Sequence, residues 1–321
     1  MTFFLLKFSR LAISLLFILS LNFLIPRIMP GNPLFTILGP DVVGLSQKEY
    51  RELEEEYGLN ATLLAQYREY LTKLLHWDLG YSYHHHRPVA LLIIDHLTRT
   101  LLLLFPSVLI SSLLAVIMGM VSGRFSGAAI DVLITLAFLA VYAMPTFLLA
   151  MVGLDLFSFR YNLFPLGGLK SPSCTGDLLS CPGDVLLHLV LPVAILSISS
   201  AAVKFMVTRN SVIEEKQQDY VLYARAKGIS TRAIWLVHIL KNASLPLLSL
   251  IALHLAFMVS GALLVEIVFS INGMGILIYE AAINRDYPVL QGCFLVLTVI
   301  VLGLNTLVDF IYGILDPRVR A

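Results

Sequence analysis

The chain has too few charged residues for a soluble globular protein. Asp, Glu, Lys and Arg make up 13% of its 321 residues, hydrophobic residues make up 58%, and the mean hydropathy is +0.85. So little charge cannot cover the surface of a soluble globule of this size. The formal net charge is only +1, and the basic residues form no stripe interleaved with aromatic side chains, so we expect no nucleic-acid partner. This composition predicts an integral membrane protein.

The sequence also lacks the motifs of common enzymes. It has no Gly-x-x-x-x-Gly-Lys-Ser/Thr loop for ATP phosphates, no Gly-x-Ser-x-Gly turn for a nucleophile and no His-Glu-x-x-His pair for zinc. Candidate acid and base residues do not cluster in pairs. We therefore expect no catalytic site and no cofactor bound by this chain, and an ATP-driven step would require another subunit.

Cysteine is scarce, since three residues are too few for a metal cluster. Cys174 and Cys181 lie in a segment rich in Ser, Pro and Gly, and an oxidising compartment could join them in a disulfide. Whether they pair stays open at this stage. Cys293 lies in an apolar run and is expected to be a buried thiol.

What the chain does have is long apolar runs. Six windows approach the roughly 20 residues that a hydrocarbon core of about 30 Å requires, and each can satisfy its own backbone only as a helix. No small-x-small cleavage site precedes Pro26, so the first window is interpreted as an uncleaved helix. Six spans place both termini on one side. The windows are 8–29, 99–121, 130–152, 185–207, 245–268 and 289–313.

The distribution of positive charge predicts the orientation. The loops on one side of the six spans carry more Lys and Arg relative to their length, whereas the opposite side carries an acidic run at 52–56, so the basic side is expected to be cytoplasmic. The outer segment after the first span has helical periodicity at 49–57 and 63–75. The basic residues assigned to the cytoplasmic side are Lys7, Arg10, Arg124, Lys204, Arg209, Lys216, Arg225, Lys227, Arg232, Lys241, Arg318 and Arg320.

The most informative segment lies between the fourth and fifth windows. Helical spacing runs over 217–225, and Gly228 follows where a helix can end. Ser230 or Thr231 can cap a second short helix that runs from Arg232. We therefore expect two short helices joined at a glycine.

One face of the first short helix carries small and aromatic side chains. Tyr220, Tyr223, Ala224 and Lys227 fall three to four residues apart and would share this face, with Arg225 and Arg232 supplying charge at its rim. Such a face can fill the groove of a partner protein. Spacing alone supports a solvated loop at the membrane surface equally well.

Motifs along nearly the whole chain resemble one family. They are Met29-Pro-Gly-Asn-Pro33, Tyr57-Gly-Leu-Asn60, His76-Trp-Asp-Leu-Gly-Tyr-Ser82, Tyr223-Ala-Arg-Ala-Lys-Gly-Ile229, His238-Ile-Leu-Lys-Asn-Ala-Ser-Leu-Pro246, Glu266-Ile-Val-Phe-Ser-Ile-Asn-Gly-Met-Gly275, Asn284-Arg-Asp-Tyr-Pro-Val289 and Asp316-Pro-Arg318. In combination they are similar to ABC-transporter permeases of the dipeptide, oligopeptide and nickel family. Gly228 of the family's loop motif is retained, whereas Leu222 stands where the general motif has Glu.

The resemblance implies an all-α integral membrane protein with about six transmembrane helices. Residues 1–29 would form the first helix, 30–98 an extracytoplasmic helical loop, and 99–321 the permease core, with a cytoplasmic coupling loop at 208–244. In that family the loop inserts into the ATP-binding subunit. The coupling residues would be Asp219, Tyr220, Tyr223, Ala224, Arg225, Lys227 and Gly228.

The resemblance also implies a function and a set of partners. The chain would be a permease subunit of an ATP-driven importer for di- and oligopeptides in the bacterial inner membrane, with both termini in the cytoplasm. It would form the pathway with a sister permease, surrounded by membrane lipid. Two ATP-binding subunits would use ATP and Mg, and an extracytoplasmic substrate-binding protein would deliver the cargo. The outer loop at 158–184 is a candidate contact for that binding protein, and a plain surface connection is the alternative.

Other functions stay open. Nickel or a metal chelate is an alternative cargo, because the motifs that begin at His238 and Asn284 look especially like the nickel-type members. A stand-alone channel or an ion-coupled secondary transporter would predict an inverted repeat or a line of midplane charges. We find no clear internal repeat, so this class is the weaker interpretation.

Polar residues within the apolar runs are candidates for the pathway or for helix seams, because a charge in the bilayer must be paired or face water. Asp155 and Glu266 lie near outer ends and could be interfacial or line the mouth of a cavity. Asn305 and Asp309 are one helical turn apart and could form a seam between helices.

Two further patterns are weighed in the same way. Gly119, Gly123 and Gly127 repeat at the four-residue spacing of close helix contacts, which favours packing. His84, His85 and His86 are a tempting metal site, but adjacent side chains point apart, so an exposed polar turn is the preferred interpretation and ligation the alternative.

Overall fold

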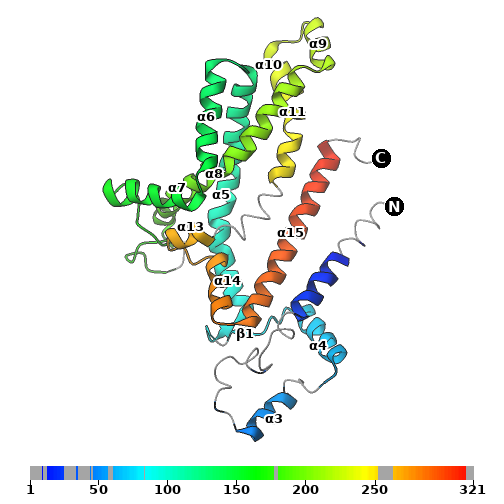
Figure 1. Ribbon diagram of the computed structural model, residues 1–321, viewed down its shortest axis with the longest axis vertical. Coiled ribbons are helices and arrows are strands. Elements are labelled where there is room, and N and C mark those ends of the chain that lie inside the picture. Colours follow the sequence, from blue (N-terminus) through cyan, green and yellow to red (C-terminus); the bar gives the residue numbers. More distant parts are fainter. Residues whose placement is uncertain are drawn as a thin grey trace. The chain divides into compact units, whose positions relative to one another are not determined.

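In the computed structural model, most of the described residues are helical (Figure 1). The structure describes residues 9, 13–24, 34, 44, 46–56, 61–82, 84–176, 180–251 and 263–315. The prediction of an all-α membrane protein is confirmed, apart from one short hairpin. Besides a helix at Ile13–Leu24, the elements are α3 (Gln47–Glu56), α4 (Leu63–Leu75), β1 (Tyr81–Ser82), β2 (Arg87–Pro88), α5 (Val89–Arg124), α6 (Ala129–Ala143), α7 (Thr146–Gly153), η2 (Leu154–Arg160), α8 (Pro182–Lys216), α9 (Asp219–Ala226), α10 (Thr231–Ala233), η4 (Ile234–Ile239), α11 (Leu240–Ala243), α13 (Leu263–Val268), α14 (Met274–Ile283) and α15 (Tyr287–Leu315).

Three of the described helices are long and apolar enough to cross a membrane, namely Val89–Arg124, Pro182–Lys216 and Tyr287–Leu307. The number rises to five if two bent pairs each count as one span. These pairs are Ala129–Ala143 with Thr146–Arg160 and Thr231–Ala243 with Leu245–Ile251. The count of six spans stays a prediction, because the windows 8–29 and 245–268 fall partly outside the described residues.

The prediction that window 130–152 forms one straight helix is wrong. α6 ends at Ala143 and α7 begins at Thr146, and the two segments are bent by 96°. Met144 has an extended conformation with ψ of 127°, and Pro145 follows with φ of −55°. Proline lacks an N–H and disfavours helical conformation in the preceding residue, so it interrupts the helix here.

The chain divides into two compact units, which are described separately. One unit combines residues 1–98 with 272–303. In this unit α5 begins beside α14 and α15, around a cluster of buried side chains. Its members are Val89, Leu92, Ile93, Met274, Leu277, Ala281, Val289 and Cys293. The prediction that Cys293 is a buried thiol is confirmed.

The helices expected in the outer segment at 49–57 and 63–75 are present as α3 and α4. A reciprocal cap opens α3, because the Ser46 N–H donates to Glu49 Oε2 at 2.8 Å while the Glu49 N–H donates to Ser46 Oγ at 3.4 Å. Hydrogen bonding to Ser46 lowers the pKa of Glu49. α4 packs on the Ile13–Leu24 helix, where the hydroxyls of Ser20 and Tyr67 lie 2.8 Å apart.

The second unit comprises residues 99–271 and 304–321. Here α5 and α8 run parallel and approach closely at glycines, since a Cβ on Gly119 would lie 2.8 Å from Thr208 and one on Gly123 would lie 2.6 Å from Val212. The predicted packing role of these two glycines is confirmed. The same prediction is wrong for Gly127, which faces open space and has φ of +83°, because it turns the chain from α5 to α6.

Candidate functional site

The 208–244 loop contains the two short helices that its sequence predicts. α9 ends at Ala226, and Gly228 follows with φ of +75°, a left-handed conformation that favours glycine. Of the two candidate caps, Ser230 is the one used, because its Oγ accepts from the Ala233 N–H at 3.4 Å. After α10 the chain continues as the π-helical η4 and then as α11.

The loop folds on a small core of its own. Buried side chains from the end of α8, from α9 and from the returning η4 and α11 form one cluster, with Met120, Tyr220 and Trp235 packed against it. Its buried members are Val212, Val221, Ala224, Ile234, Ile239 and Ala243. α9 is therefore attached to the end of α8 by packing as well as by the chain.

Tyr220 adds a polar connection beneath the same helix. Its hydroxyl donates to Glu215 of α8 and accepts from Asn242 Nδ2 of α11 at 3.0 Å. Burial, together with the bond to Glu215, raises the pKa of Tyr220 to about 12, so the phenol stays neutral at any physiological pH. One side chain thus joins the helices before and after α9.

The face of α9 that points away from this core differs from the docking face that the spacing predicts. Ala224 is only 6% exposed and Tyr220 is half-buried, so these two residues pack inward. Leu222 and Tyr223 are 67% and 69% exposed. The expected grouping of Tyr220, Tyr223, Ala224 and Lys227 on one docking face is wrong, because spacing identifies neighbours on a helix but does not show which side the rest of the chain covers.

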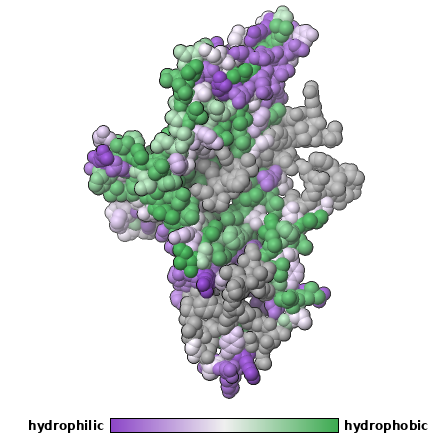
Figure 2. Space-filling view, viewed as in Figure 1, coloured by the Kyte–Doolittle hydropathy of each residue, from purple (hydrophilic) through white to green (hydrophobic). Residues whose placement is uncertain are grey.

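The exposed surface of α9 combines large apolar side chains with charge. Leu222 and Tyr223 lie within one helical turn of Asp219, and Arg225 and Lys227 are also exposed. Figure 2 shows hydrophilic residues gathered over this end of the second unit. Such a surface fits an apolar groove with a polar rim. Leu222 is not among the residues that the sequence analysis selects for docking, although its apolar character at a motif position was the available signal that it could face a partner.

Arg209, about two turns before the end of α8, ties this helix to α5 and α6. Its guanidinium donates to both carboxylate oxygens of Asp131, from Nε at 2.6 Å and from Nη2 at 2.7 Å. Asp131 is buried and also accepts from the Ser122 hydroxyl and from the Gly127 N–H at 2.9 Å. A bidentate, fully bonded ion pair of this kind has one geometry, so it fixes the α5–α6 turn against α8. The lone Asp in the apolar 130–152 window was the signal for it.

The listing of Lys204 among the basic residues of the cytoplasmic side implies a surface position, but this side chain does not lie at a surface. The side chain is fully buried between α5 and α8, and Nζ donates to Ser111 Oγ at 2.7 Å. Its position in an otherwise apolar helix could not be distinguished from a cytoplasmic end by sequence alone.

The four polar candidates of the spans have separate surroundings. Asp155 forms an ion pair with Arg160 at 2.8 Å at an exposed position. Glu266 is fully buried and accepts from Thr100 Oγ1 at 2.7 Å. Asn305 is exposed, and the side chain of Asp309 lies outside the described residues, so the expected seam between them stays a prediction.

Comparisons with known proteins identify the family to which this arrangement belongs. Residues 112–321 match the family described as binding-protein-dependent transport system inner membrane component. The chain belongs to that family. It is 36% identical to a putative peptide permease of Brucella suis biovar 1 over 97% of both chains. It is also 31% identical to the dipeptide transport system permease protein of Escherichia coli K12, over 94% and 93% of the two chains, and 30% identical to an oligopeptide transport system permease protein of Bacillus subtilis 168, over 95% of both.

In this permease the three adjacent histidines form the turn of the β1–β2 hairpin. His86 has φ of +49°, while His84 Nε2 lies 3.3 Å from the Asn284 side chain and His85 Nε2 lies 3.9 Å from Glu280. Among the described residues, no group of three His, Cys, Asp or Glu side chains converges as a metal site would require. The hairpin itself is held by Ser82, as the Oγ donates to Asp286 Oδ2.

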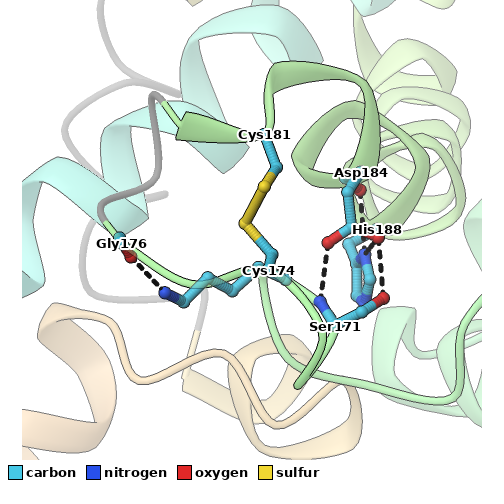
Figure 3. Close-up of a disulfide and its surroundings, with 7 residues drawn as sticks. Ser171, Cys174, Gly176, Cys181, Asp184 and His188 are labelled. Carbon is cyan, nitrogen blue, oxygen red and sulfur yellow. Dashed lines mark hydrogen bonds and ion pairs between the residues drawn. A yellow bond between two sulfur atoms is a disulfide. The ribbon is translucent and has the colours of Figure 1, made fainter.

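The permease's loop before α8 is closed by a disulfide between Cys174 and Cys181 (Figure 3). Beside it, the Ser171 N–H and hydroxyl both donate to Asp184 in the first turn of α8, at 2.6 and 2.7 Å. His188 Nδ1 lies 2.8 Å from the carbonyl oxygen of Asp184, which precedes it by one turn of α8. The disulfide and these bonds pin the loop to the start of α8. A disulfide persists in an oxidising compartment, which agrees with the predicted outer position of this loop.

Proposed function

We propose that this chain is the permease subunit of an ATP-driven importer of di- and oligopeptides, located in the bacterial inner membrane with both termini in the cytoplasm. It would line the translocation pathway with a sister permease and receive cargo from an extracytoplasmic binding protein. The observation that carries the proposal is the 208–244 loop, which presents Leu222 and Tyr223 outward from a core of its own. Full-length relatives named as dipeptide and oligopeptide permeases support peptides as the cargo.

The loop is proposed to couple ATP hydrolysis to transport. Two ATP-binding subunits would bind ATP and Mg, and closure of these subunits would push on α9. Because α9 packs on the end of α8 and Tyr220 bridges Glu215 and Asn242, the push is passed to both helices that border the loop. The Arg209–Asp131 pair then carries the displacement of α8 to α5 and α6. The helices would move as rigid bodies and open the pathway to alternate sides.

Isolation of the tagged chain from its native membrane in mild detergent tests the subunit composition. Mass spectrometry should find a sister permease and two ATP-binding subunits that follow the tag. A chain that purifies alone, in detergent that keeps it folded, would contradict the proposal and favour a stand-alone channel or secondary transporter.

Reconstitution of the same complex tests the cargo. With its binding protein added, vesicles should accumulate dipeptides or oligopeptides only when ATP and Mg are inside the compartment that holds the ATP-binding subunits. Nickel and a nickel chelate serve as alternative cargoes in the same assay. Uptake of nickel without uptake of any peptide would replace peptide by metal as the cargo and leave the coupling mechanism intact.

A further inference from the structure

α7 and η2 form a continuous apolar rod that leaves α6 nearly at a right angle. The rod extends from Thr146 to Arg160, and its bend relative to α6 is 96°. In Figure 1 it projects sideways from α6 and α8, which belong to the same unit. A helix that continues a span in this direction lies close to the plane of the membrane if α6 crosses it.

The side of the rod that faces its own unit is built from small residues. Ala150 is fully buried, and Gly153 is so close to α8 that a Cβ would lie 2.6 Å from Ile195 Cδ1. Ser158 is buried and donates to the Pro165 carbonyl oxygen at 3.1 Å. Helices approach one another in membranes through such small residues. The rod therefore uses its close-packing face within the chain.

The other side of the rod carries large apolar and aromatic side chains. Figure 2 shows this projection as a mainly hydrophobic surface with polar residues at its tip. An exposed ion pair between Arg160 and Asp155 supplies charge at that tip. The exposed apolar residues are Leu148, Met151, Val152, Phe157, Phe159 and Tyr161.

This distribution favours lipid over a second protein as the occupant of the outward side. No small residue of the rod is left exposed for a close helix contact, since Ala150, Gly153 and Ser158 all point inward. Aromatic rings beside an Arg are the composition found where a membrane meets water. The length of α6 sets the depth at which the rod lies in the membrane. Its 15 residues rise about 22 Å, whereas the hydrocarbon core is roughly 30 Å thick, so a rod that begins where α6 ends lies within the acyl chains of one leaflet.

We propose that α7 and η2 are an in-plane anchor that binds lipid in the outer leaflet. Its exposed apolar side chains, among them Leu148, Met151 and Phe159, contact acyl chains at one depth, while the charged group of Arg160 reaches toward the headgroups. The lipid contact itself requires only that the chain lies in a membrane, as its family does. The assignment to the outer leaflet rests on the proposed function, which places both termini in the cytoplasm. The anchor would hold the end of α6 at constant depth while other helices tilt.

Nitroxide labels on the intact complex test this placement. Leu148→Cys and Phe159→Cys are labelled one at a time in nanodiscs of phosphatidylethanolamine and phosphatidylglycerol, and collision with oxygen and with a water-soluble nickel chelate gives the depth of each label. The native cysteines do not interfere, since Cys293 is buried and the other two are joined. Both labels should favour oxygen over the nickel chelate and lie at nearly the same depth, although they are about 15 Å apart along the rod.

Two labels on α6 provide the matched control. Leu133 and Leu139 are exposed on this helix, and six residues along a spanning helix should change the depth by about 9 Å. If a label at 148 or 159 prevents assembly, Val152→Cys and Tyr161→Cys replace the pair.

Three results would overturn the anchor. A depth difference near 15 Å between the rod's labels would show a spanning direction. Preference for the nickel chelate would show a water-filled surface. Low access to both reagents with an immobilised spectrum would show that another protein covers the rod. None of these results would affect the coupling role of the 208–244 loop, which is measured by ATP hydrolysis.

Discussion

Single residues with the strongest constraints lie where charge is buried, and the ion pair of Asp131 with Arg209 is the clearest example. Both carboxylate oxygens are occupied by the guanidinium, and the Ser122 hydroxyl and Gly127 N–H add further bonds. The pair of Asp155 with Arg160 has a similar distance of 2.8 Å, but both of its side chains are exposed. The two Asp–Arg pairs differ in burial, so they should contribute differently to the free energy of unfolding.

Asp131→Asn should destabilise the protein by about 3–5 kcal/mol, because it leaves the Arg209 charge without its partner in a low-dielectric site. Asp155→Asn is the matched control and should cost about 0–1 kcal/mol. Thermal unfolding of the two variants in the same detergent measures the difference. Equal shifts in Tm would show that the buried pair contributes no more than the exposed one.

Tyr220 should make the 208–244 loop sensitive to alkaline pH. Its pKa is about 12 in the folded protein, above the ordinary value near 10, so the folded state holds the proton more tightly. The resulting stability is complete below pH 10 and is lost as the pH rises from 10 toward 12. Unfolding followed by Trp235 fluorescence should show this loss, and Tyr220→Phe should remove it. A Tyr220→Phe profile that parallels the unmodified protein between pH 8 and 11 would contradict the assignment.

At the scale of helices, α5 and α8 depend on close contact at glycine. Gly119→Ala places a Cβ 2.8 Å from Thr208 and should destabilise the pair by about 1–3 kcal/mol, since one of the helices must shift. Gly303→Ala is the control, because that glycine has open space in α15 and alanine favours a helix. Chemical unfolding of both variants checks the prediction, which fails if Gly119→Ala is as stable as Gly303→Ala.

Within α9, neighbouring residues should separate folding from coupling. Leu222→Asp changes an exposed side chain, so the complex should assemble with unchanged Tm but lose most of the ATP hydrolysis that the binding protein stimulates. Val221→Asp buries a charge in the loop's core and should lower both Tm and activity. Leu222→Met keeps the apolar surface and serves as the control. Normal stimulation in Leu222→Asp would exclude this surface from coupling.

The helices themselves could largely be foreseen, but their contacts could not. Helical spacing and Gly228 were enough to predict the two short helices of the loop, because caps and turns depend on adjacent residues. The inward face of α9 is set by the packing of Val221 with Ile234 and Ile239 of η4, and the spacing of residues within α9 does not predict that contact. Pro145 was visible as a helix breaker, whereas the 96° bend depends on what α7 packs against.

For the whole molecule, the orientation in the membrane is the property that connects sequence, disulfide and function. The distribution of positive charge predicts a cytoplasmic position for the 208–244 loop, and the disulfide between Cys174 and Cys181 fits the opposite, oxidising side. The two observations are independent, since one depends on insertion and the other on redox environment.

A membrane-impermeant thiol reagent tests this orientation in intact cells with a permeabilised outer membrane. After mild reduction, Cys181, which is only partly buried, should react from outside, whereas Leu222→Cys should react only once the inner membrane is opened. Cys293 should react in neither case because it is buried. Labelling of Leu222→Cys in sealed cells would invert the topology and contradict the coupling proposal.

Sequence alone was sufficient to predict that this protein lies in a membrane, that it is helical, which family it belongs to and that the 208–244 loop contains two short helices. Each of these depends on composition or on residues a few positions apart, where hydrophobicity and hydrogen bonding act directly. The folded chain was needed to show that Asp131 binds Arg209, that Ser82 binds Asp286, that Lys204 is buried and that Ala224 faces inward. These outcomes join segments from 78 to 204 residues apart or depend on which face is covered, and they are set by packing between helices, which the periodicity of one helix does not encode.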